Sequence, residues 1–322
     1  MDIPMDALNS LYLHKYRISI QPEELITLPP YKGSALRGVF GHSLRQTVCI
    51  QKDTDCQECP LSLKCVYSYI FETPIPQDDP FGRKYSSAPH PYIITPPITS
   101  KKYFKEDDQL DFEVVLIGKA NDYLPYFVYT FMEMGKLGIG RGRGRFKLIN
   151  VSVCQNDGSL TEIFNISDGI LRSANNKIDS EILTSHFPFP ISHLTITFET
   201  PVRIKEEGDL VATDIPFSLL IKRLYERVTL LSYYHCQGEI KDIDKPISGA
   251  DEIRIKENNL KWYDWERYSN RKGRMKLGGL VGSITYEGNL DKFLPLLRIG
   301  EYIHVGKAVT FGLGRYRIKT GE

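Results

Sequence analysis

Four of the six cysteines lie close together in the sequence, at Cys49, Cys56, Cys59 and Cys65. Four thiolates can close a tetrahedron around one metal ion, and the short step from Cys56 to Cys59 is a frequent chelating turn. We therefore expect a structural zinc ion, with no ligand position left for a catalytic water. An iron–sulfur cluster is the alternative, because cysteine-only ligation at irregular spacing also suits it. Unligated buried thiols are the third interpretation.

Two segments combine glycines with cationic side chains. The first, Gly138–Leu148, contains Gly140, Arg141, Arg143 and Arg145, and the second, near the C-terminus, contains His304, Lys307, Gly312, Gly314 and Arg315. Glycines let backbone amides approach a phosphate closely, and arginines supply charge and planar stacking surfaces. Each segment therefore predicts a phosphate cradle on an RNA-binding surface. The structural alternative is that the glycines form a hairpin or a bulge and that the arginines are solvated. Because the glycine-rich segment occurs twice, at the ends of two similar parts of the chain, we favour RNA binding.

Among the seven histidines, His42 has the best context for proton transfer. Histidine suits this role because its pKa lies near neutrality. On a helical wheel of residues 33–49, His42 lies opposite the apolar stripe of Leu36, Phe40 and Leu44, and Arg45 lies on its side. The sequence therefore places an imidazole beside a cation and outside the core. The alternative is an exposed helix residue that packs against a neighbouring domain.

The composition favours a soluble, cytoplasmic protein with local basic stripes. The chain has 322 residues, with 41 basic and 40 acidic side chains and a net charge of +1, so no global field attracts nucleic acid. Basic residues instead gather in 132–150 and in 261–276, where we assign Arg267, Arg271 and Lys272 to RNA binding. Neither a secretory signal nor a membrane-spanning apolar run is visible. Thiols or metal ligands are therefore expected instead of disulfides.

Periodicity predicts an α+β fold made of two tandem ferredoxin-like domains, which share the RRM-like order βαββαβ. The first half gives strands at 11–20, 110–117 and 146–154 and helices at 33–49 and 123–136, with one more strand required inside 89–95. The second half gives strands at 194–204, 260–268 and 275–286, helices at 217–236 and 290–297, and a last strand after the second glycine-rich segment. We expect a first domain at 1–160 with a cysteine-rich insertion at about 49–97, a linker at 161–190 and a second domain at 191–322.

The sequence resembles the CRISPR-associated precursor-RNA processing endoribonucleases, family six of these proteins, within the RAMP superfamily. The resemblance covers nearly the whole chain, and it rests on residues 33–45, 124–126, 134–135, 267–269, 278–282, 304–307 and 311–314. It implies two ferredoxin-like domains side by side, a guide-repeat RNA substrate and metal-independent cleavage. In such cleavage the 2′-hydroxyl attacks the adjacent phosphorus and leaves a 2′,3′-cyclic phosphate and a 5′-hydroxyl.

The resemblance also implies roles for individual residues. The family's catalytic histidine lies at or near the first helix, and His42 is the matching position here. Tyr31, just before the helix, is expected to orient the imidazole or to act as a second acid or base. Arg45 or Arg37 is expected to stabilise the phosphorane, and we also assign Arg37 to RNA binding.

The leading hypothesis is thus a metal-independent endoribonuclease that binds CRISPR repeat RNA and cleaves precursor guide RNA, as a monomer or homodimer away from membranes. One alternative is a non-catalytic subunit that holds guide RNA inside a larger CRISPR ribonucleoprotein complex. A second alternative is a metal- or redox-dependent nucleic-acid protein whose cysteines hold an iron–sulfur centre.

Overall fold

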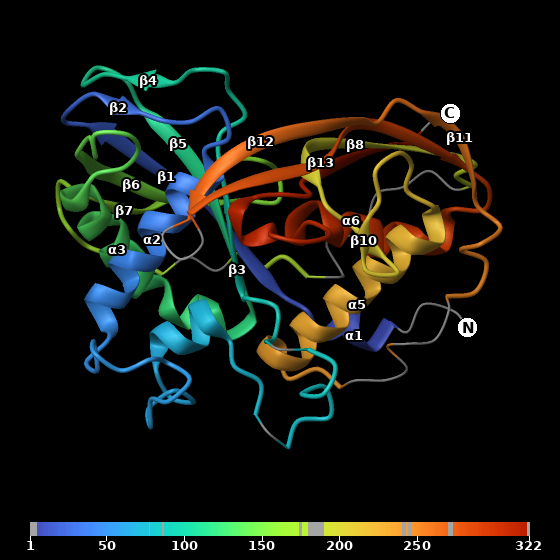
Figure 1. Cartoon of the computed structure of the whole chain (residues 1–322), viewed down its shortest axis with the longest axis horizontal. Helices are drawn as coiled ribbons and strands as arrows, with labels where there is room; N and C mark the ends of the chain where they lie inside the picture. The colour runs from blue at the N-terminus through green and yellow to red at the C-terminus, as the bar shows by residue number, and fades with distance from the viewer. Residues whose placement is uncertain are drawn as a thin grey trace. The chain divides into compact units, whose positions relative to one another are not determined.

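The computed structural model describes residues 5–76, 78–85, 87–173, 176–179, 190–239, 243, 247–269 and 273–320, with the backbone alone for 5, 266–269 and 273–276. These residues form two compact units (Figure 1). The N-terminal unit is Leu13–Ile178 with Tyr234–Cys236, and the C-terminal unit is Met1–Tyr12 with Asp179–Tyr233 and Gln237–Glu322.

The N-terminal unit has the predicted βαββαβ order. Its elements are β1 (Leu13–Pro22), α2 (Gly33–Val48), β3 (Tyr92–Thr95), β5 (Leu110–Ile117), α3 (Leu124–Leu137) and β6 (Phe146–Cys154). The sheet runs β3-β5-β1-β6-β7, where β7 is Leu160–Asn165, and all neighbouring strands are antiparallel. This order is the ferredoxin-like one with an added edge strand, and β3 is the strand that the sequence required inside 89–95. A short ribbon of β2 (Ile26–Thr27) and β4 (Tyr103–Phe104) lies outside this sheet.

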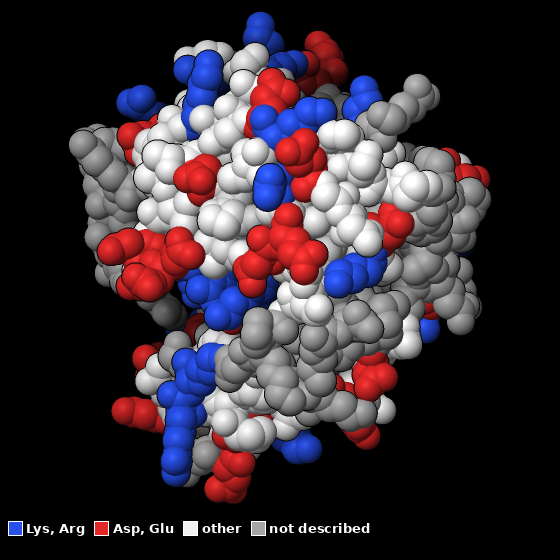
Figure 2. All heavy atoms as spheres, turned by 90° about the vertical axis from the view of Figure 1, so that its right-hand side faces the viewer, with Lys and Arg blue, Asp and Glu red and all other residues white. Residues whose placement is uncertain are grey.

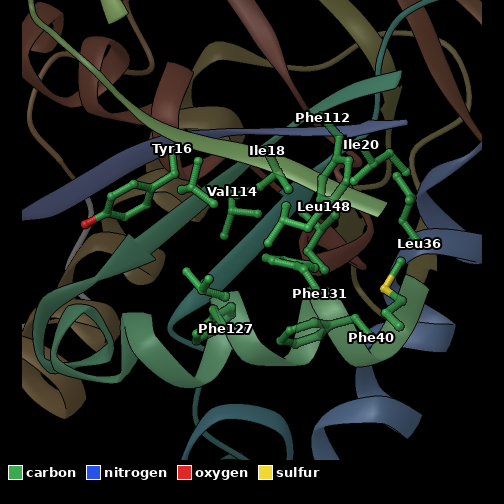
Figure 3. Packing of buried hydrophobic residues seen from close by; sticks show 14 of the residues in the cluster. Tyr16, Ile18, Ile20, Leu36, Phe40, Phe112, Val114, Phe127, Phe131 and Leu148 are labelled. Carbon is green, nitrogen blue, oxygen red and sulfur yellow. The ribbon is translucent and has the colours of Figure 1, made fainter. Parts of the chain in front are cut away.

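The predicted stripe of α2 forms part of the core. Leu36, Phe40 and Leu44 are all fully buried. The Phe40 ring lies 5.1 Å from that of Phe127 and 5.4 Å from that of Phe131, both on α3. Figure 3 shows these rings meeting aliphatic side chains from the sheet. Burial of this face fixes the rotation of α2, so the opposite face must carry His42 away from the core.

The linker expected at 161–190 begins differently in the structure. Residues Leu160–Asn165 form β7, which pairs with β6 as the edge strand of the first sheet. The polar sequence concealed this strand because an edge strand exposes most of its residues, and only Ile163 and Phe164 are buried here. At the other end, the helix α1 (Met5–Ser10) belongs to the C-terminal unit instead of the expected first domain, and its Ala7 and Leu8 are buried.

The C-terminal unit has the βαββαβ order with one strand that the sequence did not predict, β11 (Arg254–Asn258), between the first helix and the predicted pair of strands. Its elements are β8 (His193–Val202), α5 (Phe217–Cys236), β11, β12 (Lys261–Ser269), β13 (Gly273–Glu287), α6 (Leu294–Ile303) and β14 (Tyr316–Thr320). The sheet runs β11-β13-β8-β14, and β12 pairs separately with β13 as a hairpin. The short strands β9 (Lys205–Glu206) and β10 (Asp209–Leu210) form a ribbon of their own. The predicted fold class is confirmed for both halves.

The helix predicted at 290–297 is wrong in its bounds. A 3-10 turn, Asp291–Phe293, comes first, and α6 then runs from Leu294 to Ile303. Pro295 explains the shift, because proline lacks a backbone donor and is tolerated in the first turn of a helix but not in its interior.

Among the described residues, no helix is both long enough and apolar enough to cross a bilayer. Figure 2 shows basic and acidic side chains interspersed on one face, where neither sign dominates. This pattern agrees with the net charge of +1. An RNA-binding surface would therefore have to be built from individual basic side chains.

Candidate functional site

His42 is exposed on α2, on the side opposite the buried stripe, as the helical wheel predicts. One turn earlier, Gly38 offers no side chain, and nothing lies within 4 Å of the place where its Cβ would stand. Because helical side chains lean toward the preceding turn, this open space lies where the imidazole can reach. Within the described part of the chain, the imidazole has neither a hydrogen-bond nor an ion-pair partner. It is therefore accessible to a substrate.

Tyr31 lies half-buried just before α2. Its burial raises the pKa of the phenol well above the usual value, because the charged phenolate would lose solvation. A tyrosine is protonated at neutral pH even with its usual pKa, and the burial makes loss of the proton still less favourable. Of the two expected roles, this favours a hydrogen-bond donor that orients a neighbour over a base that takes up a proton.

Arg37 and Arg45 are both engaged by the segment that follows α2. The Nη2 of Arg45 donates to the carbonyl oxygens of Lys52, at 3.2 Å, and Thr54, at 3.1 Å. The guanidinium of Arg37 lies 3.8 Å from the ring centroid of Phe71, in a π-helical turn at Ser68–Glu72. The structure thus gives these two arginines an internal role in holding the cysteine-rich segment against α2.

The four clustered cysteines are half-buried free thiols. No group of three or more His, Cys, Asp or Glu side chains in the described ranges is arranged to hold a metal ion. The four thiols therefore do not form a ligand set here, and the zinc proposal, like its iron–sulfur rival, rests on sequence spacing alone. Metal analysis of the purified protein tests it, and we derive no chemical step through a metal.

The first glycine-rich loop is anchored to the strand β2. The amide of Arg141 donates to the carbonyl oxygen of Thr27 at 2.8 Å. A Cβ at Gly140 would collide with this same carbonyl oxygen, and one at Gly144 would collide with that of Leu25. These glycines are therefore required by close backbone packing, which is the structural role that the sequence left open for them.

The tip of this loop is different. Gly142 has a φ of 86°, and nothing lies within 4 Å of the place where a Cβ would stand, while the flanking Arg141 and Arg143 are exposed. Neither arginine side chain has a partner among the described residues. By contrast, Arg145 forms an ion pair with Glu24, with 2.7 Å between Nη2 and Oε1. The accessible cations of the first loop are thus Arg141 and Arg143.

In the second glycine-rich loop, His304 is a structural residue. It is 2 % exposed, and its Nδ1–H donates to the carbonyl oxygen of Leu313 at 3.2 Å, because a carbonyl can only accept. Gly312 and Gly314 have φ angles of 81° and 69°, and a Cβ at Gly314 would collide with the carbonyl oxygen of Val305. The loop is therefore folded tightly on itself.

The cations of the second loop also divide into paired and unpaired ones. Arg315 forms an ion pair with Glu199, with 2.6 Å between Nε and Oε2. Lys307 is exposed, and its backbone amide donates to the carbonyl oxygen of Arg203 at 2.8 Å. Its ammonium group has no partner in the described part of the chain. Of the basic turn, Arg271 and Lys272 lie outside the described residues, and Arg267 is described in its backbone alone.

Two further arginines are unusual in the structure, although no sequence pattern marks them. Arg203, directly after β8, and Arg227, on α5, each have buried guanidinium nitrogens without a hydrogen-bond partner among the described residues. Neither belongs to a glycine-rich segment, and no spacing rule marks either one. The only available signal is their burial, which a sequence pattern does not show.

Two protein-family models match the chain. Residues 11–176 match a family described as an N-terminal domain, and residues 196–316 match the family described as CRISPR-associated endoribonuclease Cas6. A curated protein of Archaeoglobus fulgidus, described as an uncharacterized protein, is 25 % identical over 302 residues, which cover 91 % of this chain and 93 % of that protein.

Several solved structures share the fold. A partial Cas6-RT-Cas1–Cas2 complex matches with a TM-score of 0.56 and 15 % identity over 97 % of this chain, but over only 46 % of the matched chain. In the Cas6-RT-Cas1–Cas2 complex, the share of the matched chain is 29 %, so the present chain spans less than half of these proteins. The product complex of Cas6 (TTHB231) from Thermus thermophilus gives a TM-score of 0.53 and 12 % identity, over 95 % of this chain and 99 % of that one.

Proposed function

The chain belongs to the Cas6 family of CRISPR-associated endoribonucleases, and on this premise we propose that it binds CRISPR repeat RNA and cleaves precursor guide RNA without a metal ion. The proposed reaction is an attack of the 2′-oxygen on the adjacent phosphorus. The bond from phosphorus to the 5′-oxygen breaks, leaving a 2′,3′-cyclic phosphate and a 5′-hydroxyl. A base must accept the proton of the 2′-hydroxyl, and an acid must supply one to the leaving oxygen.

One observation supports the catalytic proposal most strongly, namely the exposed imidazole of His42 beside open space on α2. We assign to it one of the two proton transfers, since an imidazole is a side chain that can accept or donate a proton in acid–base catalysis. Tyr31, whose buried phenol resists deprotonation, is assigned the role of a hydrogen-bond donor. Arg141 and Arg143 in the same unit supply unpaired charge for RNA phosphates.

The proposal predicts cleavage of repeat RNA in the presence of excess EDTA, because every proposed step uses side chains and the RNA's own hydroxyl. The measurement is gel analysis of labelled repeat RNA under conditions where binding is confirmed. RNA that stays bound and uncut in EDTA, but is cut when a divalent ion is restored, would contradict the metal-independent mechanism.

Replacing both Arg141 and Arg143 with glutamine is expected to weaken RNA binding at each salt concentration and to lower the salt dependence of the affinity. Each lost phosphate contact lowers the slope of log K against log salt by roughly 0.7 to 1. The matched control is Arg145→Gln, which removes a cation that Glu24 already neutralises. An equal loss of RNA affinity in the double variant and in the control would show that Arg141 and Arg143 contribute no more to RNA binding than Arg145 does.

A non-catalytic guide-RNA-binding subunit is the second candidate. Two observations favour it: similar chains occur in Cas6-RT-Cas1–Cas2 complexes, and His42 lacks a described side chain that orients it. Both candidates propose CRISPR repeat RNA as the ligand and a larger CRISPR complex as the partner assembly. Stable binding without cleavage, in EDTA and in divalent ions alike, would select the second candidate.

A further inference from the structure

The short ribbon of β2 and β4 in the N-terminal unit is extended by the first glycine-rich loop. Figure 1 shows the two strands of this ribbon side by side. Thr27 on β2 pairs with Tyr103 on β4, and on its other side it forms an isolated antiparallel bridge with Arg141. The amide of Arg141 donates to the carbonyl oxygen of Thr27 at 2.8 Å. Three segments that lie far apart in the sequence thus place Tyr103, Thr27 and Arg141 in one row.

The three side chains of this row point to the same face of the ribbon. Residues directly opposite each other in antiparallel strands share a face, and the next residue along each strand points to the other face. The next pair, Ile26 and Phe104, is only 0 % and 3 % exposed and belongs to the hydrophobic core. The face of Tyr103, Thr27 and Arg141 is therefore the one turned away from the core.

This outer face combines an exposed aromatic ring with an exposed cation. Tyr103 is 59 % exposed and Arg141 is exposed, while the short side chain of Thr27 between them is half-buried. Among the described residues, the side chains of Tyr103 and Arg141 make no ring contact, hydrogen bond or ion pair. Neighbouring strands lie about 4.8 Å apart, so roughly 10 Å separates the Cα atoms of these two residues. Both side chains are long, so one small ligand can contact the ring and the guanidinium together.

We infer that Tyr103 and Arg141 form a platform for one unpaired nucleotide of the repeat RNA, with its base stacked on the ring and a phosphate bound by the guanidinium. An exposed ring on a sheet face offers a stacking surface to any base, and a guanidinium presents donors that match phosphate oxygens. The nucleotide is unpaired because bases inside a duplex are already stacked. The cation beside the ring favours a nucleotide over an apolar protein segment. The platform deepens the proposed function and rests on it.

The first test compares two substitutions of Tyr103, with a repeat RNA made uncleavable by a single 2′-deoxynucleotide at the cut. Tyr103→Leu keeps an apolar side chain and removes the ring, so it should weaken binding roughly 5- to 100-fold. The salt dependence of the affinity should stay unchanged, because stacking neutralises no phosphate. Tyr103→Phe keeps the ring and should bind within about two-fold of the wild type. Fluorescence anisotropy at several salt concentrations gives these values.

A matched control and a thermal melt separate binding from folding. Tyr129 is 51 % exposed on the helix α3 of the same unit, so Tyr129→Leu removes an equally accessible ring outside the ribbon. This control should leave the RNA affinity within about two-fold of the wild-type value. Tyr103→Leu should unfold close to the wild-type melting temperature, because the ring that it removes is exposed.

A scan with abasic nucleotides identifies the stacked base. Repeat RNAs that each lack one base are titrated with the wild-type protein and with Tyr103→Leu. At one unpaired position, the abasic RNA should bind the wild type about as weakly as the complete RNA binds Tyr103→Leu. The variant should lose no further affinity with this abasic RNA, since the ring and the base make one shared contact.

The outcomes separate the platform from the proposed function. Unchanged RNA affinity in Tyr103→Leu, or a loss that Tyr129→Leu matches, overturns the platform while the nuclease stands. An equal loss in Tyr103→Phe, or additive losses at every abasic position, overturns stacking in the same way. Absence of cleavage by a wild-type protein whose binding depends on Tyr103 as described removes the nuclease and leaves the platform. Failure of the wild-type protein to bind any repeat RNA overturns both proposals.

Discussion

Replacing His42 with alanine is expected to slow cleavage of repeat RNA by roughly two to four orders of magnitude and to leave the affinity for RNA nearly unchanged. The imidazole is exposed on α2 and has no partner among the described residues, so its removal disturbs neither the core nor a hydrogen-bond network. The loss should therefore appear in the chemical step. Single-turnover cleavage rates, with protein in excess over RNA, measure that step separately from product release.

The control for this substitution is Gln46→Ala. Gln46 is exposed one turn further along the same helix and brings no acid–base chemistry. Its replacement should leave the cleavage rate within a few-fold of the wild-type rate. Both variants should unfold close to the wild-type melting temperature. Full activity of His42→Ala would remove His42 from the site, and an equal loss in Gln46→Ala would show that this helix face binds RNA without doing chemistry.

Replacing Gly314 with alanine is expected to destabilise the C-terminal unit by about 3 kcal/mol, from a strained left-handed backbone and an overpacked contact. Gly314 has a φ of 69°, and its new Cβ would collide with the carbonyl oxygen of Val305. This carbonyl belongs to the rigid backbone of the loop, so neighbouring side chains cannot relieve the collision. The measurement is a calorimetric melt, in which a transition of this unit should move to lower temperature.

The matched substitution is Gly142→Ala at the tip of the first loop. Gly142 has a φ of 86°, but no atom lies within 4 Å of its Cβ position. The cost should therefore be the backbone strain alone, about 1 kcal/mol. Similar losses of thermal stability in the two variants would contradict the roles assigned here, in which Gly314 is required by close backbone packing and Gly142 lies at an open loop tip.

The fold followed from the sequence where apolar periodicity was strong. The stripe of Leu36, Phe40 and Leu44 and the alternation in β5 and β6 predicted their elements closely, because each buries one face in a shared core. The strand β7 was missed, since an edge strand with two buried residues carries little hydrophobic signal. The bounds of α6 were wrong because apolar spacing was given more weight than the position of Pro295.

The candidate site followed from the sequence less completely. The helical wheel gave the exposure of His42, because one buried face of α2 fixes the opposite one. It could not show that Arg45 donates to Lys52 and Thr54, since these contacts depend on how the next segment folds back. Likewise, no pattern predicted the unsatisfied guanidinium of Arg203, which is a property of three-dimensional burial.

The chemical nature of the RNA ends tests the central claim most directly. Repeat RNA is incubated with the protein in EDTA, and the products are identified by mass spectrometry, beside a substrate carrying one 2′-deoxynucleotide at the cut. The account predicts a 2′,3′-cyclic phosphate and a 5′-hydroxyl from the natural RNA, and no cleavage of the bound deoxy substrate. A 5′-phosphate, or cleavage of the deoxy substrate at the same position, would contradict it.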